Sequence, residues 1–400
     1  MKQPSAELPA LSRRRFFTAA AGLGMASAAG LTVSCTGAAS TTGGHPSPAG
    51  RVLADTVADA FKTHRLVGIG EVHHLQQHHD VLDTLLTDPR LPGVVDDIVV
   101  EFGNAHYQDT MDRFIAGLPV DNADLRLAWR NTTQSPEETW DQPVYEQFFR
   151  AVRAANWALP PGKQMRVLLG DPPINWATIT DAGDLEAAIQ QRDTYPASLA
   201  EQQVLAKGRR ALLCYGMAHL FHPVPELHTV PNLVSIIEHR TGERTYTIAD
   251  LVPLAGDPGG LATRLTGYPR NTVIPATGTW LASFDAGLFA QVQAGSGSSS
   301  RSHQSSAAAG PSSGQANPLC GAPAGSVIDD GLYLGQPEDL TASCWNPAVF
   351  LDPAYWAELQ RRNALEGHPV NLDTYRQPEP ALFPLLKVPP SAECGQDGRP

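Results

Sequence analysis

The chain has 400 residues, of which 42% are hydrophobic, and it carries a formal net charge of −12. That length is enough for one large domain or for two small domains with proper cores. The acidity argues against nucleic acid as the main partner, because binding to phosphates needs a basic surface. No internal run is long and apolar enough to predict a helix that crosses a membrane.

The N-terminus is typical of an export signal. The basic stretch "SRRRFF" at residues 12–17 precedes a short apolar stretch, rich in Ala and Gly, at residues 19–33. This pattern predicts a twin-arginine signal over residues 1–35, and therefore a periplasmic or otherwise extracytoplasmic protein. The sequence "LTVSC" at residues 31–35 is similar to a lipoprotein cleavage box. A lipid on Cys35 would anchor the protein to a membrane, and a plain secreted form is the alternative.

The remaining cysteines suggest one disulfide and one buried thiol. In an oxidising compartment Cys320 and Cys344 could pair across a loop. Cys214 lies in an apolar run and is expected to be a buried thiol. No CxxC motif occurs, which argues against a structural zinc ribbon.

Composition divides the rest of the chain into a core domain and flexible segments. Residues 36–50 are small and polar and predict a tether. The main domain is expected over residues 51–290. The Gly/Ser/Ala-rich segment 294–318 cannot form a core and predicts a disordered insertion. Residues 319–376 would return a strand and a helix to the same domain, and residues 377–400 form a proline-rich tail.

Short apolar runs alternate with helix-like stretches along the main domain. Because these runs are continuous and not alternating, they predict strands that are buried on both faces. The alternation predicts the α/β class, with a mainly parallel sheet flanked by helices. The expected strands are residues 66–69, 98–100, 165–169, 211–215, 232–237, 245–248 and 331–334. The expected helices are residues 74–86, 107–116, 145–155 and 192–207.

Ionisable side chains stand just past the ends of several predicted strands. Because the carboxyl ends of parallel strands open on one edge of a sheet, these side chains are expected to converge in a polar site. They are Glu71, His73, Glu101, Asp171 and His219.

Two of these histidines belong to a repeated Gly-x-x-His pattern, "GEVH" at residues 70–73 and "GMAH" at residues 216–219. Glycine would let the backbone turn tightly after the strand. His73 and His219 with Glu71 and Glu101 would supply nitrogen and oxygen ligands for a divalent metal such as zinc, manganese or cobalt. The same set without a metal could let His73 take a proton from water while a carboxylate orients its ring. Like-charge repulsion between Glu71 and Glu101 would raise the pKa of one of them. The alternative is that each histidine is a satisfied polar group in a loop.

Three further histidines follow the first motif closely. His74, His78 and His79 lie at the start of a predicted helix, where outer-shell or solvated roles are favoured over ligation. His222 follows the second motif and could support the same site.

Other polar residues are candidates for supporting roles. Arg192 and Asp193 are expected either to orient the histidines or to form an ordinary helix charge pair. Arg130, in the polar stretch "WRNTTQ" at residues 129–134, could bind an anionic group of a substrate or simply lie in a surface loop. Tyr107 and Tyr145 are expected in the core, with substrate contact or haem ligation as alternatives.

The quoted motifs, together with "IVVEFGN" at residues 98–104 and "RDTYPASLAEQQ" at residues 192–203, resemble the ChaN-like, erythromycin-esterase-like and Tiki-like superfamily. The resemblance covers roughly residues 60–240. It implies an α/β sheet with its site at the strand ends. That group contains haem-binding lipoproteins, esterases that open macrolide rings and metal-dependent proteases. By this resemblance Glu71, His73, Glu101 and His219 would form the site, with His73 as the base and with Arg192 and Asp193 as the Arg-Asp pair of a helix.

The leading hypothesis is therefore an exported protein with a hydrolase-like Glu/His site, with or without a metal, that cleaves an ester or an amide. In it His73 activates water, Glu71 and Glu101 orient or ligate, and His219 ligates or stabilises an oxyanion. Two other hypotheses stay open. One is a haem or iron carrier on the cell surface without catalysis, and the other is an inactive relative that binds a protein or glycan.

Overall fold

A computed structural model describes residues 50–160, 162–224, 231–289, 317–367 and 369–385. The predicted signal and tether, apart from residue 50, lie outside these ranges, as does most of the predicted insertion at 294–318. The predicted tail is described as far as residue 385. Within the described ranges, no helix has the length and apolar character needed to cross a membrane.

The described residues form an eight-stranded sheet in the order β1-β7-β8-β6-β2-β5-β3-β4. The strands from β8 to β4 pair in parallel, whereas β7 runs antiparallel to both β1 and β8. The strands are β1 (Arg51–Val52), β2 (Leu66–Glu71), β3 (Asp97–Asn104), β4 (Arg166–Asp171), β5 (Ala211–Gly216), β6 (Tyr246–Asp250), β7 (Thr272–Pro275) and β8 (Asp330–Tyr333). This arrangement confirms the predicted α/β class with a mainly parallel sheet.

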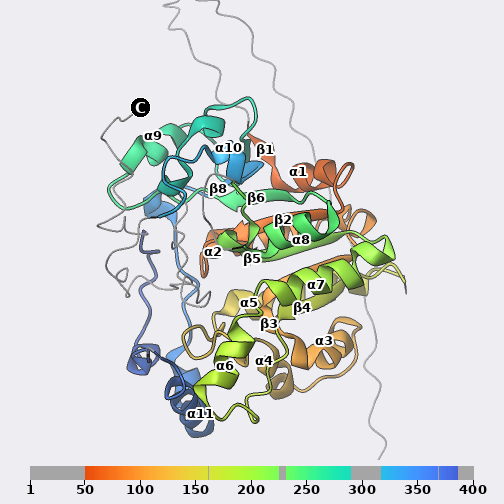
Figure 1. Ribbon diagram of the computed structural model, residues 1–400, viewed down its shortest axis with the longest axis vertical. Coiled ribbons are helices and arrows are strands. Elements are labelled where there is room, and N and C mark those ends of the chain that lie inside the picture. The colour runs from red at the N-terminus through yellow and green to blue at the C-terminus, as the bar shows by residue number, and fades with distance from the viewer. Residues whose placement is uncertain (1–49, 161, 225–230, 290–316, 368, 386–400) are drawn as a thin grey trace, which may run out of the picture. The chain divides into compact units, whose positions relative to one another are not determined.

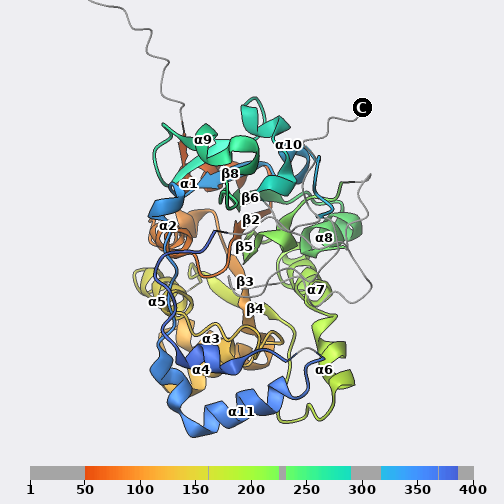
Figure 2. The same cartoon turned by 90° about the vertical axis from the view of Figure 1, so that its left-hand side faces the viewer.

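Helices cover both faces of the sheet, as Figures 1 and 2 show from two directions. In Figure 2, α1, α2 and α5 lie on one side of the strands, while α7 and α8 lie on the other. The helices are α1 (Leu53–Ala60), α2 (Gln76–Leu86), α3 (Gln108–Ile115), α4 (Asn122–Arg130), α5 (Pro143–Trp157), α6 (Ala182–Ile189), α7 (Thr194–Gln203), α8 (Leu233–Thr241), α9 (Leu261–Leu265), α10 (Ala324–Val327) and α11 (Pro353–Asn363). Two layers of helices explain why the central strands read as continuous apolar runs, since every residue of β2, β3 and β5 is buried.

One predicted strand is wrong. The apolar run at residues 232–237 belongs to α8. Asn232 and Ser235 form a capping box at its N-terminus, and Gly242 ends it in the left-handed conformation. Its buried residues, Leu233, Val234 and Ile237, are spaced for one face of a helix. Caps at both ends therefore outweigh the β-branched composition of the run.

The predicted disulfide is also wrong. Cys344 is a free thiol, whereas Cys320 is disulfide-bonded. The Cys344 sulfur lies 3.5 Å from the backbone oxygen of Glu379, so it contacts the segment that follows α11. Cys214 is a buried free thiol on β5, as expected.

The sheet order brings the carboxyl ends of five neighbouring parallel strands to one edge. Along the order β6-β2-β5-β3-β4, these strands end at Asp250, Glu71, Gly216, Asn104 and Asp171. Residues 60 to 180 positions apart in the sequence therefore become neighbours in space, at the edge where parallel sheets bind ligands.

Candidate active site

The two Gly-x-x-His motifs pack against each other. A Cβ atom on Gly70 would lie 2.8 Å from the backbone of Met217 in the second motif. A Cβ atom on Gly216 would lie 2.8 Å from Cε1 of His73 in the first motif. Neither glycine has a positive φ, so close approach and not a tight turn requires glycine at both positions.

Each motif histidine is paired with a carboxylate through its Nδ1 atom. His73 Nδ1 lies 2.6 Å from Glu71 Oε1, and His219 Nδ1 lies 2.5 Å from Asp193 Oδ1. His219 is on a short 3-10 helix, η4 (Met217–Leu220), and Asp193 directly precedes α7. The carboxylates fix the ring orientations and leave both Nε2 atoms directed at a third acid.

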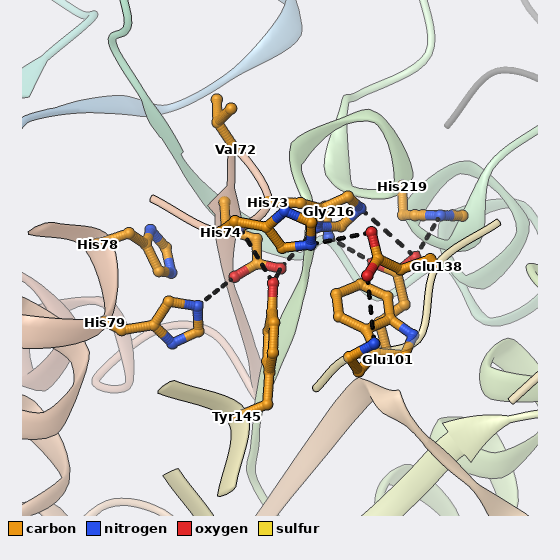
Figure 3. Close-up of polar contacts among 12 residues, drawn as sticks. Val72, His73, His74, His78, His79, Glu101, Glu138, Tyr145, Gly216 and His219 are labelled. Carbon is orange, nitrogen blue, oxygen red and sulfur yellow. Dashed lines mark hydrogen bonds and ion pairs between the residues drawn. The ribbon is translucent and has the colours of Figure 1, made fainter. Parts of the chain in front are cut away.

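That third acid is Glu101, in the last half of β3. Its Oε1 atom lies 3.9 Å from Nε2 of His73 and 3.4 Å from Nε2 of His219. The structure thus places together the four side chains selected from the sequence, and Figure 3 shows His73, Glu101 and His219 among them. Of the four, His73 is the most exposed, with 11% of its side chain accessible.

The acids around the two imidazoles determine their charge. Burial alone would lower the pKa of His73, but Glu101 and Glu71 outweigh burial and raise that pKa to about 9. In the same way burial alone would lower the pKa of His219, but Asp193 and Glu101 raise it to about 10. Both rings are therefore imidazolium cations at neutral pH, and His73 can accept a proton only under alkaline conditions.

Glu71 stays ionised although it is deeply buried. Burial alone would raise its pKa, but hydrogen bonds with His73 and His79 hold the pKa well below the usual range. His79 Nε2 lies 2.9 Å from Glu71 Oε2, and the hydroxyl of Tyr145 donates to Glu71 Oε1 at 3.2 Å. The expected rise in a carboxyl pKa through like-charge repulsion is wrong for Glu71, because imidazoles lie against both of its oxygens.

The three histidines that follow the first motif, His74, His78 and His79, are buried and pair with carboxylates. His78 Nδ1 lies 2.9 Å from Asp250 Oδ1, and Asp250 Oδ2 accepts the backbone N–H of Val72. His74 Nε2 lies 2.9 Å from Glu138 Oε2. His74, His78 and His79, which Figure 3 shows near His73, are buried, so they support the site from outside and are not solvated.

Asp171 is another buried acid, at the end of β4 and next to the strand that carries Glu101. Burial raises its pKa to about 7, although hydrogen bonds from Thr133 and the charge of Arg192 oppose that rise. Thr133 donates both its backbone N–H and its hydroxyl to the Asp171 carboxylate. Arg192 in turn donates to the Thr133 hydroxyl and backbone oxygen. Arg192 thus braces the loop next to the site, while Asp193 orients His219.

Two other predicted residues are engaged elsewhere. His222 lies between Glu238 (3.1 Å) and Asp329 (2.9 Å). Arg130 forms an ion pair of 2.7 Å with Asp141. A substrate-binding role for Arg130 stays a prediction, and its guanidinium already has an acidic partner.

The sequence analysis missed the side chains that the loop at residues 131–142 contributes. Gln134 Nε2 donates to Glu101 Oε1 at 2.6 Å, and Trp140 packs edge-on against His73 with ring centroids 4.9 Å apart. Glu138 pairs with His74. The polar stretch "WRNTTQ" was the available signal, but its pattern left a substrate contact and a surface loop equally open, and the loop is buried.

The C-terminal helix fastens this loop from outside. Arg362 of α11 is only 2% exposed and donates to the backbone oxygen of Arg130, to Asn131 Oδ1 and to Ser135 Oγ. Tyr375, in the following 3-10 helix η10 (Leu372–Arg376), donates its hydroxyl to the backbone of the same loop. A segment more than 200 residues away therefore holds the loop against the site.

The donor atoms are of the types that hold a divalent metal, but their arrangement does not form a ligand set. Imidazole nitrogen and carboxylate oxygen suit zinc, manganese or cobalt, and ligating histidines usually pair their second nitrogen with a carboxylate. Among the described residues, however, no three His, Cys, Asp or Glu side chains are grouped so that they could hold a metal ion. Glu101 also accepts hydrogen bonds on both oxygens, from Gln134 and from the backbone N–H of Gly216. The proton transfers proposed for this site are therefore assigned to its side chains.

Haem does not fit the same side chains. An axial ligand must offer an imidazole nitrogen or a phenolate to the iron. Tyr145 is fully buried with its hydroxyl on Glu71, and Tyr107 accepts a hydrogen bond from Asn131 at 2.6 Å. The imidazoles of the site each lie against a carboxylate, as described above. Iron binding through Nε2 of His73 or His219 would require Glu101, whose Oε1 atom lies 3.9 and 3.4 Å from these nitrogens, to move aside.

Comparisons with known proteins find similarity at the level of the fold. No protein-family model matches the chain, and no curated protein matches it significantly. Among solved structures, one of ChaN of Campylobacter jejuni with cofacially bound haem is 13% identical, with a TM-score of 0.32, over 49% of this chain and 85% of that chain. The type III effector HopBA1 is 14% identical, with a TM-score of 0.30, over 54% of this chain and 90% of that chain.

A structure described as bacterial protein toxins is 21% identical, with a TM-score of 0.32, over 50% of this chain and 37% of that chain. At these identities and scores the similarities transfer no activity, and function must be argued from the side chains of the site.

Proposed function

We propose that the protein is a hydrolase that cleaves an ester or an amide at the site formed by Glu71, His73, Glu101 and His219. The observation that carries this proposal is the convergence of two carboxylate–imidazole pairs on one carboxylate oxygen, with Nε2 atoms 3.9 and 3.4 Å from Glu101 Oε1. An imidazole oriented by a buried carboxylate is the arrangement that general-base catalysis requires.

The two imidazoles take different roles. His73 is the more exposed ring, with 11% of its side chain accessible against 4% for His219, so it is the ring that water reaches. Neutral His73 takes a proton from water through Nε2 as the water oxygen bonds to the carbonyl carbon, and Glu71 stabilises the imidazolium that forms. His219 donates from Nε2 to the oxyanion that develops on the carbonyl oxygen. When the C–O or C–N bond breaks, the His73 imidazolium returns its proton to the leaving alcohol or amine, and the carboxylic acid product remains.

The role of His73 is tested by the substitution His73→Gln, with p-nitrophenyl acetate and a p-nitroanilide as probes. The variant should lose roughly 100-fold or more in kcat/KM, since it lacks the base. His106→Gln is the matched control, because His106 is exposed and surface imidazoles cleave activated esters weakly. Equal rates for the two variants, after correction for spontaneous hydrolysis, would remove His73 from the mechanism.

The same assay separates side-chain catalysis from metal catalysis. Since the chemistry above uses side chains alone, the wild-type rate should be unchanged after dialysis against a chelator. Loss of the rate, with recovery on adding zinc, manganese or cobalt, would instead make His73 and His219 metal ligands.

A haem or iron carrier is the alternative function, and the resemblance to ChaN motivates it. Titration of the purified protein with haem decides it. The enzyme proposal expects no sharp Soret band at one or two equivalents. A stoichiometric band that Tyr145→Phe or His73→Gln abolishes would favour the carrier. If neither haem binding nor hydrolysis depends on His73, an inactive relative that binds a protein or glycan would be favoured.

We also infer export by the twin-arginine route, from the basic and apolar pattern of residues 12–33. Mass spectrometry of the mature N-terminus tests this inference and the lipid on Cys35 together. A mature chain that begins at residue 35 with an acyl mass supports the lipoprotein form. An N-terminus at residue 1 or 2 in the protein's own host contradicts export.

A further inference from the structure

The loop at residues 131–142 connects α4 to α5 and is buried, although loops usually run over the surface. Gln134 is 4% exposed and Trp140 is fully buried. Both side chains face the proposed active site, where Gln134 contacts Glu101 and Trp140 contacts His73. Most buried polar groups find hydrogen-bond partners, and Gln134 uses both ends of its amide in this way.

We propose that Gln134 is a positioning residue of this site, which sets the orientation of Glu101 and thereby the spacing of the two imidazoles, and that Trp140 fixes Gln134. The inference rests on the proposed hydrolytic function. It adds a residue that acts through Glu101, without touching the substrate itself.

The chemistry of the two neighbours forces the orientation of the amide. Trp140 Nε1 donates to Gln134 Oε1 at 2.8 Å, and Gln134 Nε2 donates to Glu101 Oε1 at 2.6 Å. An indole N–H can only donate, and an ionised carboxylate can only accept. A side chain between them must therefore accept at one end and donate at the other, which glutamine does and glutamate or methionine does not.

Gln134 controls the oxygen that both imidazoles face. The backbone N–H of Gly216 donates to Glu101 Oε2 at 2.6 Å, and Gln134 Nε2 donates to Oε1, so a hydrogen bond holds each oxygen. Loss of the Gln134 amide removes one of the contacts that orient Oε1 between the two imidazoles. The distances of 3.9 and 3.4 Å to His73 and His219 therefore depend on Gln134.

Strained backbone on both sides of the contact supports a functional role for the loop. Trp140 has φ of 52° and His74 has φ of 66°, values that large L-residues rarely adopt. Glu138 connects them, since its Oε1 accepts the backbone N–H of Trp140 and its Oε2 lies 2.9 Å from His74 Nε2. Such strain persists where surrounding contacts enforce it, and it concentrates at active sites.

The test compares Gln134→Met, Trp140→Phe and the double variant in p-nitrophenyl acetate hydrolysis. Gln134→Met should lower kcat by roughly 10- to 100-fold with KM within about twofold, as outer-shell losses do. Trp140→Phe should lower kcat by less. Because Trp140 acts through Gln134, the double variant should be no worse than Gln134→Met. Gln142→Met is the matched control, since Gln142 is a buried glutamine of the same loop whose side-chain oxygen has no hydrogen-bond partner among the described residues.

Several outcomes overturn the inference. Multiplicative losses in the double variant would show independent roles for Gln134 and Trp140. A loss in KM alone, or an equal loss in Gln142→Met, would show that the loop contributes binding or general stability and not the orientation of Glu101.

A second readout keeps the inference separable from the proposed function. At fixed pH, Gln134→Met should shift the ring C–H NMR signals of His73 and His219, whereas Gln142→Met should leave them in place. If the wild-type protein hydrolyses neither probe but Gln134→Met still shifts these signals, the proposed function is contradicted and the positioning role of Gln134 is supported. If Gln134→Met fails to fold, Trp140→Phe decides through the His219 signal, because the smaller ring also changes the ring-current shift at His73 without any movement of Glu101. An unshifted His219 signal would contradict the inference.

Discussion

His73 combines exposure, orientation and a raised pKa in one side chain. Its Nδ1 atom is held by Glu71, and its Nε2 atom faces Glu101 at the more open side of the site. The same acids that orient the ring also keep it protonated near neutral pH, with a pKa of about 9. The residue that the first motif marks is therefore a strong base that acts only when the pH approaches that value.

Asp193 should control the charge of His219. In Asp193→Asn the shape is retained while the charge nearest to Nδ1 is removed, so the pKa of His219 should fall from about 10 by at least one unit. The alkaline limb of the pH profile of kcat should shift to lower pH by the same amount. Asp109→Asn, at an exposed position on α3, serves as the control. A profile that does not move would show that His219 does not donate to the reacting group.

At the scale of elements, the site depends on α11 as much as on the strands. The loop at residues 131–142 reaches the site with Gln134 and Trp140 and is held from outside by Arg362. Arg362 also lies over the ring of Trp176, 4.5 Å from its centroid. One buried guanidinium thus satisfies several loop oxygens that would otherwise be unpaired.

Arg362→Met should destabilise the protein by about 3 kcal/mol, because it leaves buried oxygens of the loop without a donor. Chemical denaturation measures this change. Arg126→Met is the control, since Arg126 of α4 is 42% exposed and forms a 3.6 Å ion pair with Glu146, so its loss should cost below about 1 kcal/mol. The first variant should also lose hydrolytic activity at temperatures where it remains folded. Equal destabilisation of the two variants would contradict the role given to α11.

For the whole molecule, the acidic partners of its histidines couple stability to pH. The folded-state pKa values of His73 and His219 are about 9 and 10, above the ordinary value of 6.5. The folded protein therefore binds these protons more tightly than the unfolded chain does. The resulting stabilisation is complete below about pH 6.5 and is lost as the pH rises through 9 and 10.

We therefore expect the melting temperature to fall between pH 7 and pH 10, by roughly 5 °C for a loss of about 3 kcal/mol. The pKa of His222 is raised in the same direction: burial alone would lower it, but Asp329 and Glu238 outweigh burial. Thermal unfolding followed by circular dichroism measures the trend, and His219→Gln should flatten it. A melting temperature that is constant or rises over this range would show that the imidazoles are not held as cations.

Much of the fold and the choice of site residues followed from local patterns. Continuous apolar runs that end in Gly or an acid located β2, β3, β4 and β5, and parallel topology explained why Glu71, Glu101 and His219 meet. The prediction failed at α8, where an apolar run rich in β-branched residues indicated a strand but caps at both ends favoured a helix. It also missed the short strand β7, which lies between β1 and β8 and whose burial depends on these neighbours.

The contribution of the loop could not be predicted, for a physical reason. Gln134 and Trp140 have no periodicity that distinguishes a buried loop from an exposed one. Their burial depends on Arg362, more than 220 residues away in the sequence. Long-range packing of this kind leaves no local signature, so the second half of the site was visible only in three dimensions.

The most direct test of the central claim is the pH dependence of kcat/KM for p-nitrophenyl acetate, measured in wild type and in His73→Gln between pH 6 and pH 9.5. The wild-type excess over the variant should rise about tenfold per pH unit and level off near pH 9, as neutral His73 becomes available. An excess that is absent, or that is largest below pH 7 and declines as the pH rises, would contradict a water-activating base at this position.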